Sequence, residues 1–255
     1  MNQGQSAISR YREIIKYHGL LRGLRRVFDQ IAEVDFYDSI HATNTRQILS
    51  GGDFLTGLSD VDAAAAMHYQ PVYTSAVRKP LRHLVASYPI LGASSTCFLD
   101  LGCGRGKALH VARSMLQHAT LIGMDLHPAL LKDAARNLGL TGPTNGARLA
   151  RGDVIDAPKI KLICNDVNAV DYAALLASFD VIVAFNKNSF DLATTERTLR
   201  LLRSAAGAKK WLFYVYSNPV FEHLFAGDHC VFTMTGWHKN WNTKVFLRTP
   251  AALIG

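Results

Sequence analysis

The chain has 255 residues, which is enough for one large α/β domain with a modest extension. Its apolar fraction of 49% and charged fraction of 19% predict a substantial core and exclude an intrinsically disordered protein. No apolar run approaches the roughly 18 residues that a membrane-spanning helix needs. Four dispersed cysteines without a Cys-x-x-Cys pair argue against a zinc site or a disulfide framework. We therefore expect a cytoplasmic protein with no membrane span.

The net charge of +8 is concentrated at the amino end of the chain. Residues 1–28 contain six basic side chains and one acidic side chain, whereas the rest of the chain is close to neutral. This uneven distribution gives nucleic-acid binding only weak support.

Apolar residues recur at helical spacing between the basic residues, so residues 8–33 are predicted to form one amphipathic helix. We expect its apolar stripe to pack on the rest of the protein, with the arginines in water. A lid over an active site, a surface for acidic partners and a targeting segment are the alternatives for its role. Residues 34–66 are turn-rich and are predicted to form a connector with short helices. The predicted organisation is a helical extension over residues 1–66 and a larger domain over residues 67–255.

From residue 96 onward, apolar strand-like runs alternate with helical patterns. Strands are expected at residues 97–100, 120–124, 160–164, 181–185 and 211–217, with helices at residues 107–117 and 128–138 after the first two. Residues 139–158 hold six glycines or prolines and are expected to form a long loop. Residues 231–235 and 244–248 are expected to form a C-terminal antiparallel hairpin. This order predicts an α/β protein with a mainly parallel, seven-stranded, Rossmann-like sheet.

The most informative stretch lies at the end of the first predicted strand. Asp100 ends that strand, and Gly102, Gly104 and Gly106 lead from it into a helix. Glycines allow a sharp turn and a close approach to a ligand, and the helix N-terminus offers unpaired N–H groups. The spacing differs from the Gly-x-Gly-x-x-Gly of dinucleotide-binding folds. A second acid, Asp125, ends the next strand, where it would accept hydrogen bonds from ribose hydroxyls. Together these features favour S-adenosylmethionine as the cofactor, with Asp100 beside its ammonium group.

Residues 98–106 resemble motif I of class I S-adenosylmethionine-dependent methyltransferases, and residues 123–125 resemble their second acidic motif. The likeness extends to an uncharacterised group that is distantly similar to the Dot1 histone-lysine methyltransferase. The further motifs of that group correspond here to Tyr69-Gln70-Pro71, Asn165-Asp166-Val167, Asn188-Ser189-Phe190 and Asn218-Pro219-Val220. Two departures are Ser189, where the group has proline, and Asn165, where it has glycine. The first predicts a more mobile loop at the methyl-transfer site.

The resemblance implies a set of residues around the cofactor. The expected cofactor-binding residues are Tyr69, Pro71, Asp100, Leu101, Gly102, Cys103, Gly104, Gly106, Asp125, Leu126, Asp166, Val167 and Asn186. Asn188 is the expected catalytic residue and competes with Asn186 for the same place at the strand end. Asp153 is the alternative to Asp166 as the acceptor for the adenine amino group. Asp166 is preferred because a whole predicted strand separates Asp153 from the fourth strand.

The predicted function is methyl transfer from S-adenosylmethionine to an unidentified acceptor: a protein side chain, a small molecule or RNA, in that order. A catalytically inactive cofactor-binding module and a nicotinamide-dependent oxidoreductase are the alternatives. None of the ten histidines forms a metal-ligand pair such as His-Glu-x-x-His, so no metal is expected. Trp237 and Trp241 fit either hairpin packing or stacking on a nucleic acid.

Overall fold

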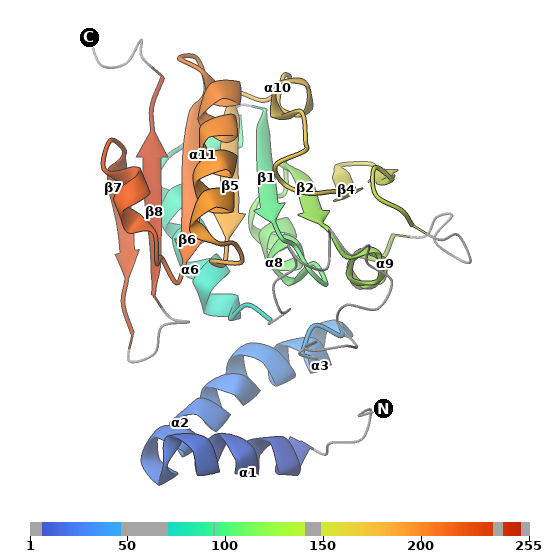
Figure 1. Cartoon of the computed structure of the whole chain (residues 1–255), viewed down its shortest axis with the longest axis vertical. Helices are drawn as coiled ribbons and strands as arrows, with labels where there is room; N and C mark the ends of the chain where they lie inside the picture. The colour runs from blue at the N-terminus through green and yellow to red at the C-terminus, as the bar shows by residue number, and fades with distance from the viewer. Residues whose placement is uncertain (1–6, 47–70, 94, 141–148, 237–241, 251–255) are drawn as a thin grey trace.

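The structure, a computed structural model, describes residues 7–46, 71–93, 95–140, 149–236 and 242–250. Its centre is a mixed eight-stranded sheet with the strand order β3-β4-β2-β1-β5-β6-β8-β7 (Figure 1). The strands are β1 (Thr96–Leu101), β2 (Thr120–Asp125), β3 (Val154–Ala157), β4 (Ile160–Cys164), β5 (Val181–Asn186), β6 (Trp211–Ser217), β7 (His229–Met234) and β8 (Thr243–Arg248). The central strands β4, β2, β1, β5 and β6 are parallel, and β8 pairs antiparallel with both β6 and β7. The Rossmann-like architecture and the C-terminal hairpin are therefore confirmed.

Helices cover both faces of the sheet (Figure 1). They are α6 (Thr74–Ser87), α7 (Ile90–Ala93), α8 (Lys107–Met115), α9 (Pro128–Asn137), α10 (Tyr172–Leu175) and α11 (Leu192–Ala206), with a 3₁₀ turn at Glu222–Phe225. Every residue of β1 and β5 is buried, as expected for parallel strands covered on both sides. Along β1 the side chains alternate between the two cores. Phe98 packs with α6 and α8, whereas Leu99 and Leu101 pack with α10 and α11.

The edge strand β3 corrects the prediction of one uninterrupted loop over residues 139–158 and raises the strand number from seven to eight. Val154–Ala157 pairs antiparallel with β4 at the margin of the sheet. Its residues alternate between exposed and half-buried, so the strand lacks the continuous apolar run by which the central strands were predicted.

The amino-terminal extension is not a single helix over residues 8–33. Gly19 adopts a left-handed conformation with φ of 77° and separates α1 (Ala7–His18) from α2 (Leu20–Gln30). The two helices pack so closely that a Cβ added to Gly23 would lie 2.5 Å from the Ile15 Cα. A π-helix (Ile31–Asp35) and α3 (Phe36–His41) continue the chain. Apolar periodicity predicted one helix because it follows only the spacing of the apolar residues. It therefore registers neither the break at Gly19 nor the close packing at Gly23.

The expected packing of the apolar stripe is wrong for α2. Leu21 is 83% exposed and Phe28 is 70% exposed, so this face of α2 points to water rather than to the sheet. Strands β1 and β2 point toward the extension, which lies beyond the carboxyl edge of the sheet (Figure 1). The domain boundary predicted at residue 66 falls outside the described residues. Within the described ranges, no helix is long and apolar enough to cross a membrane.

Candidate functional site

The glycine loop between β1 and α8 forms the centre of the candidate site. The φ values of Gly102, Gly104 and Gly106 are 75°, 52° and 76°. Residues other than glycine rarely adopt such positive values. The Cys103 N–H donates to the Met124 carbonyl at 2.7 Å and ties the loop to β2. A Cβ added to Gly106 would lie 3.1 Å from the Ala134 Cβ, so α9 also packs directly on the loop. The loop is held in a shape that only glycine provides at low cost.

Asp125 closes this loop from the neighbouring strand. Its Oδ2 accepts a hydrogen bond from the Gly104 N–H at 2.8 Å, and its Oδ1 accepts one from the His127 N–H at 2.8 Å. Burial raises the pKa of Asp125, while these two backbone donors act in the opposite direction. The residue is half-buried, and an ionised carboxylate has about four lone-pair sites. Acceptor capacity therefore remains for the hydroxyl groups of a ligand.

Asp100 lies at the end of β1 and is only 2% exposed. Burial raises its pKa well above the usual value, and the nearby Asp125 carboxylate raises it further. A cationic group placed beside Asp100 would favour the ionised form, as the predicted ammonium partner requires.

The residues close to these two acids in the sequence, Leu101, Cys103 and Leu126, also have packing roles. Leu101 is buried in the core shared with α10 and α11, and Leu126 is half-buried. The Cys103 side chain faces the sheet, since its Sγ lies 3.0 Å from where a Cβ on Gly123 would be. Burial raises the pKa of the Cys103 thiol well above its usual value. The backbone of Cys103 belongs to the loop, whereas its thiol is a packing group.

Asp166 follows β4, which lies directly beside β2. The Asn165 N–H donates to the Asp125 carbonyl at 3.1 Å, so this turn adjoins the end of β2. The Asp166 Oδ1 accepts from the Asn168 N–H at 2.8 Å, and Val167 is buried. Asp153 is exposed and precedes the outer strand β3, where its Oδ2 accepts from the Ala150 N–H at 2.7 Å. Asp166 is therefore one strand nearer to the glycine loop than its rival.

Asn186 and Asn188 do not occupy equivalent places. Asn186 is fully buried, donates to the Tyr214 hydroxyl at 3.1 Å and accepts from the Ser189 N–H at 3.1 Å. Asn188 is half-buried, with φ of 58°, and its Oδ1 accepts from the Tyr216 hydroxyl at 2.8 Å. Asn186 thus shapes the turn, while Asn188 is the residue that reaches the surface.

The turn after β5 also lies over the glycine loop. A Cβ added to Gly102 would be 3.5 Å from both the Ser189 Cβ and the Phe190 ring. Tyr69 lies outside the described residues. The Pro71 carbonyl accepts from the Lys187 Nζ at 2.9 Å, which places the segment that begins at Pro71 beside the end of β5. The structure therefore brings the turns after β1, β2, β4 and β5 and the Pro71 segment together at one edge.

Two basic residues in this region were missed by the sequence reasoning. The Arg105 guanidinium donates to the Asn44 carbonyl at 3.1 Å and pairs with Asp133 at 3.2 Å. Lys107 is 2% exposed and its Nζ donates to the Glu33 carbonyl at 2.6 Å. A lysine in the first turn of a helix is unfavourable because its charge opposes the helix dipole. This unfavourable position is the one feature of the sequence that could have singled out Lys107. Arg105 thus ties the extension to the glycine loop, and Lys107 ties it to α8.

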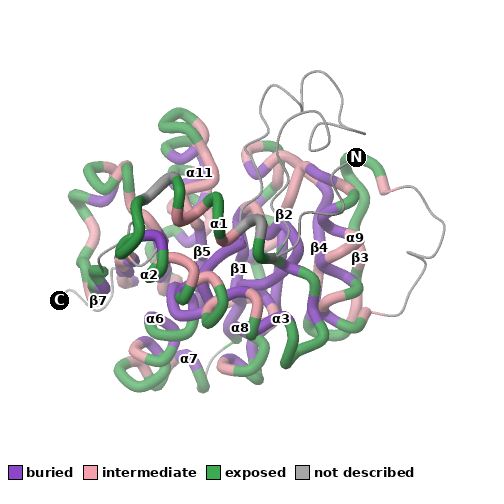
Figure 2. The backbone as a smooth tube through the Cα atoms, turned by 90° about the horizontal axis from the view of Figure 1, so that it is seen from below, coloured by how far each residue is buried: buried purple, intermediate pink, exposed green. Residues whose placement is uncertain are grey.

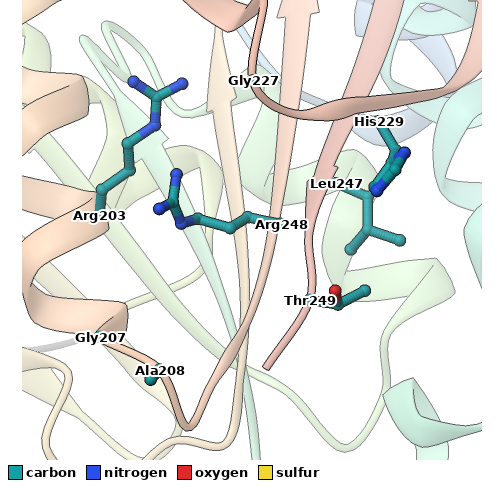
Figure 3. Close-up of a pocket in the computed structure, with 8 residues that line it drawn as sticks. All are labelled: Arg203, Gly207, Ala208, Gly227, His229, Leu247, Arg248 and Thr249. Carbon is teal, nitrogen blue, oxygen red and sulfur yellow. The ribbon is translucent and has the colours of Figure 1, made fainter. Parts of the chain in front are cut away.

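A separate pocket of about 370 Å³ lies elsewhere on the molecule (Figure 3). Arg203 and Arg248 both pair with Asp228 beside it. Arg248, which lines the pocket, pairs in register with Leu212 near the start of β6. The pocket therefore lies at the amino edge of the parallel strands, opposite the glycine loop. It is therefore not part of the candidate site. Across the described ranges, no group of three or more His, Cys, Asp or Glu side chains is arranged to hold a metal.

Residues 93–212 match the family model of a methyltransferase domain. The match covers slightly less than half of the chain and contains the glycine loop and the turns after β2, β4 and β5. The sheet order and this match together support a class I methyltransferase. The finer resemblance to the Dot1 histone-lysine methyltransferase stays a prediction.

Solved structures with a similar fold share little sequence with the chain. An S-adenosylmethionine-dependent methyltransferase from Leishmania major is 14% identical, with a TM-score of 0.46, over 69% of this chain and 72% of the other. A mutant of MtNAS in complex with S-adenosylmethionine is 12% identical, with a TM-score of 0.43, over 97% and 85%. TrmN from Thermus thermophilus is 14% identical, with a TM-score of 0.44, over 67% and 47%. All three TM-scores are below 0.5. No curated protein matches the sequence.

Proposed function

We propose that the chain transfers the methyl group of S-adenosylmethionine to an acceptor, with the cofactor at the carboxyl edge of β1, β2 and β4. One observation carries this proposal: the Asp125 carboxylate is tied to Gly104 in the middle of three left-handed glycines. A ligand can approach the backbone of this glycine loop closely. The hydrogen bond to Gly104 holds the Asp125 carboxylate oxygens at a fixed place beside the loop. The methyltransferase-domain match over the same residues supports the same cofactor.

The residues present fit this cofactor. Asp125 offers acceptors for the ribose hydroxyls, and Asp100 offers a buried carboxylate for the ammonium group. Asp166 lies one strand further along the edge, where it would accept from the adenine amino group. When bound, the cofactor supplies a methyl group already activated by its sulfonium leaving group.

Alignment is then the main contribution of the protein. Orientation of two reacting groups contributes up to about 7–11 kcal/mol in favourable cases. Asn188 is the residue proposed to position the acceptor, because Tyr216 holds its Oδ1 and leaves its amide nitrogen as a donor. A general base is needed only where the acceptor arrives protonated.

The acceptor class is tested by transfer of a labelled methyl group into a fractionated lysate, with protein, RNA and metabolite pools counted separately. We expect label in protein first, and in small molecules or RNA otherwise. The Asn188→Ala variant is the control that separates transfer by this site from background. Cofactor binding without label in any pool would favour the inactive binding module.

A further inference from the structure

Helix α2 presents its apolar side to water. Leu21, Leu24 and Phe28 are 83%, 49% and 70% exposed and lie three, four and seven positions apart, which places them on one side of the helix. Ile31, at the start of the following π-helix, continues the row and is 40% exposed. Single exposed apolar residues are ordinary, but a row of large ones along one helix marks a surface that binds something.

The positions of α2 that the protein buries lie away from this row. Gly23 packs against the Ile15 backbone of α1, and Asp29 is only 7% exposed. Rotation of α2 that hid Leu21 and Phe28 would therefore pull Gly23 away from Ile15 and expose the Asp29 side. The outward direction of the apolar row is thus fixed by the helical hairpin itself.

Basic side chains surround this apolar row. Arg22 and Arg25 of α2 are exposed, as are Arg12 and Lys16 of α1. The acids of residues 7–30 are Glu13, which is exposed, and Asp29, which is buried. The hairpin therefore combines an apolar strip with an excess of positive charge.

We propose that the α1–α2 hairpin docks on the surface of an anionic lipid bilayer, with Leu21, Leu24 and Phe28 inserted at the headgroup level. A row of large apolar residues with exposed arginines beside it, on a helix of low overall hydrophobicity, is typical of helices that lie in the membrane interface. A second copy of the chain fits less well. Symmetric contact through this strip would bring Arg22 and Arg25 of both copies together, and like charges oppose such an interface.

Contacts made by the segment after α2 fix how the α1–α2 hairpin is held on the rest of the protein. The Glu33 carbonyl binds Lys107, and its carboxylate accepts from the Ser75 N–H at 2.8 Å. These contacts hold the segment after α2 to α8 and α6, while the hairpin lies beyond the carboxyl edge of the sheet (Figures 1 and 2). The proposal concerns a surface that is independent of the cofactor site, so it stands or falls without methyl transfer.

The test is sedimentation of the full chain with vesicles of phosphatidylcholine alone and of equimolar phosphatidylcholine and phosphatidylglycerol. We expect binding to the anionic vesicles and much weaker binding to the neutral ones. Phe28→Gln should weaken binding about tenfold, as expected for one apolar side chain kept out of the interface. Arg22→Gln should weaken it about fivefold, which corresponds to about 1 kcal/mol for one charge near an anionic surface.

Matched controls are available on the same chain. Val85→Gln removes an apolar side chain that is 45% exposed on α6, and Arg197→Gln removes an exposed arginine on α11. Neither control should change vesicle binding, and circular dichroism should show all four variants folded. Equal sedimentation with neutral and anionic vesicles, or an unchanged affinity for Phe28→Gln, would overturn the proposal. So would a dimer in light scattering that Phe28→Gln dissociates, if the wild-type chain binds no vesicles.

Discussion

The Lys107 ammonium, in the first turn of α8, donates a hydrogen bond to the backbone carbonyl of Glu33 at 2.6 Å. The two residues are 74 positions apart and join the helical extension to the helix that follows the glycine loop. The same ammonium lies 4.8 Å from the centre of the Tyr37 ring, and the Tyr37 hydroxyl contacts the His110 Nδ1 at 2.6 Å. The extension is therefore anchored to the helix that directly follows the glycine loop of the candidate site.

Lys107 is expected to give the stability of the fold a distinct pH dependence. Burial lowers the pKa of Lys107 from 10.5 to about 8 in the folded chain. Between these values the unfolded chain binds the additional proton, so the free energy of unfolding rises as pH increases from about 8 to 10.5. The shift corresponds to about 3 kcal/mol across this window. Denaturant unfolding of the wild type and Lys107→Met at several pH values measures it, because other titrating groups are common to both. Parallel pH profiles would show that Lys107 does not titrate as described.

Gly106→Ala is expected to destabilise the protein by about 1–3 kcal/mol, because Gly106 is left-handed and strained backbone has a cost of this order. The new Cβ would also lie 3.1 Å from the Ala134 Cβ of α9. Gly139→Ala is the matched control, since Gly139 has φ of 68° and no heavy atom within 4 Å of the added Cβ. Thermal unfolding of both variants isolates the contact with α9. An equal loss in the two would mean that this packing contributes nothing.

Asp125→Ala is expected to weaken S-adenosylmethionine binding by about 10- to 150-fold, the range for loss of a charge-assisted hydrogen bond. Asp156→Ala is the control, because Asp156 is an exposed carboxylate on the edge strand β3. Calorimetric titration of both variants gives the two dissociation constants. An unchanged constant for Asp125→Ala would remove this residue from the cofactor site.

Asn188→Ala is expected to lower kcat about 10²-fold while changing cofactor affinity little, because orientation effects act on the transfer step. Tyr216→Phe removes the hydroxyl that holds the Asn188 Oδ1 and should produce a smaller effect in the same direction. Single-turnover kinetics with labelled cofactor separates the two parameters. Loss of cofactor affinity without loss of rate would identify Asn188 as a binding residue instead.

The sheet and its glycine loop could be predicted because they depend on local signals. Buried parallel strands such as β1 are continuous apolar runs, and left-handed turns such as the one at Gly104 favour glycine. The extension could not be predicted in the same way. A single glycine such as Gly19 does not by itself end a predicted helix. The contact of Gly23 with α1 depends on tertiary packing, and apolar periodicity does not state which side of a helix the protein covers.

The candidate site shows the same division. Asp100 and Asp125 follow strands that the sequence identifies, so their meeting at one edge was predictable. The distinction between Asn186 and Asn188 depends on the partners Tyr214 and Tyr216, which come from a strand about 30 residues away in the chain. Such partners have no local signature.

The central claim is tested most directly by calorimetric titration of the wild-type chain with S-adenosylmethionine, S-adenosylhomocysteine and NAD. The proposed site predicts that both sulfur ligands bind at a single site and that NAD does not bind. Binding of NAD, or no binding of either sulfur ligand at millimolar concentration, would contradict it.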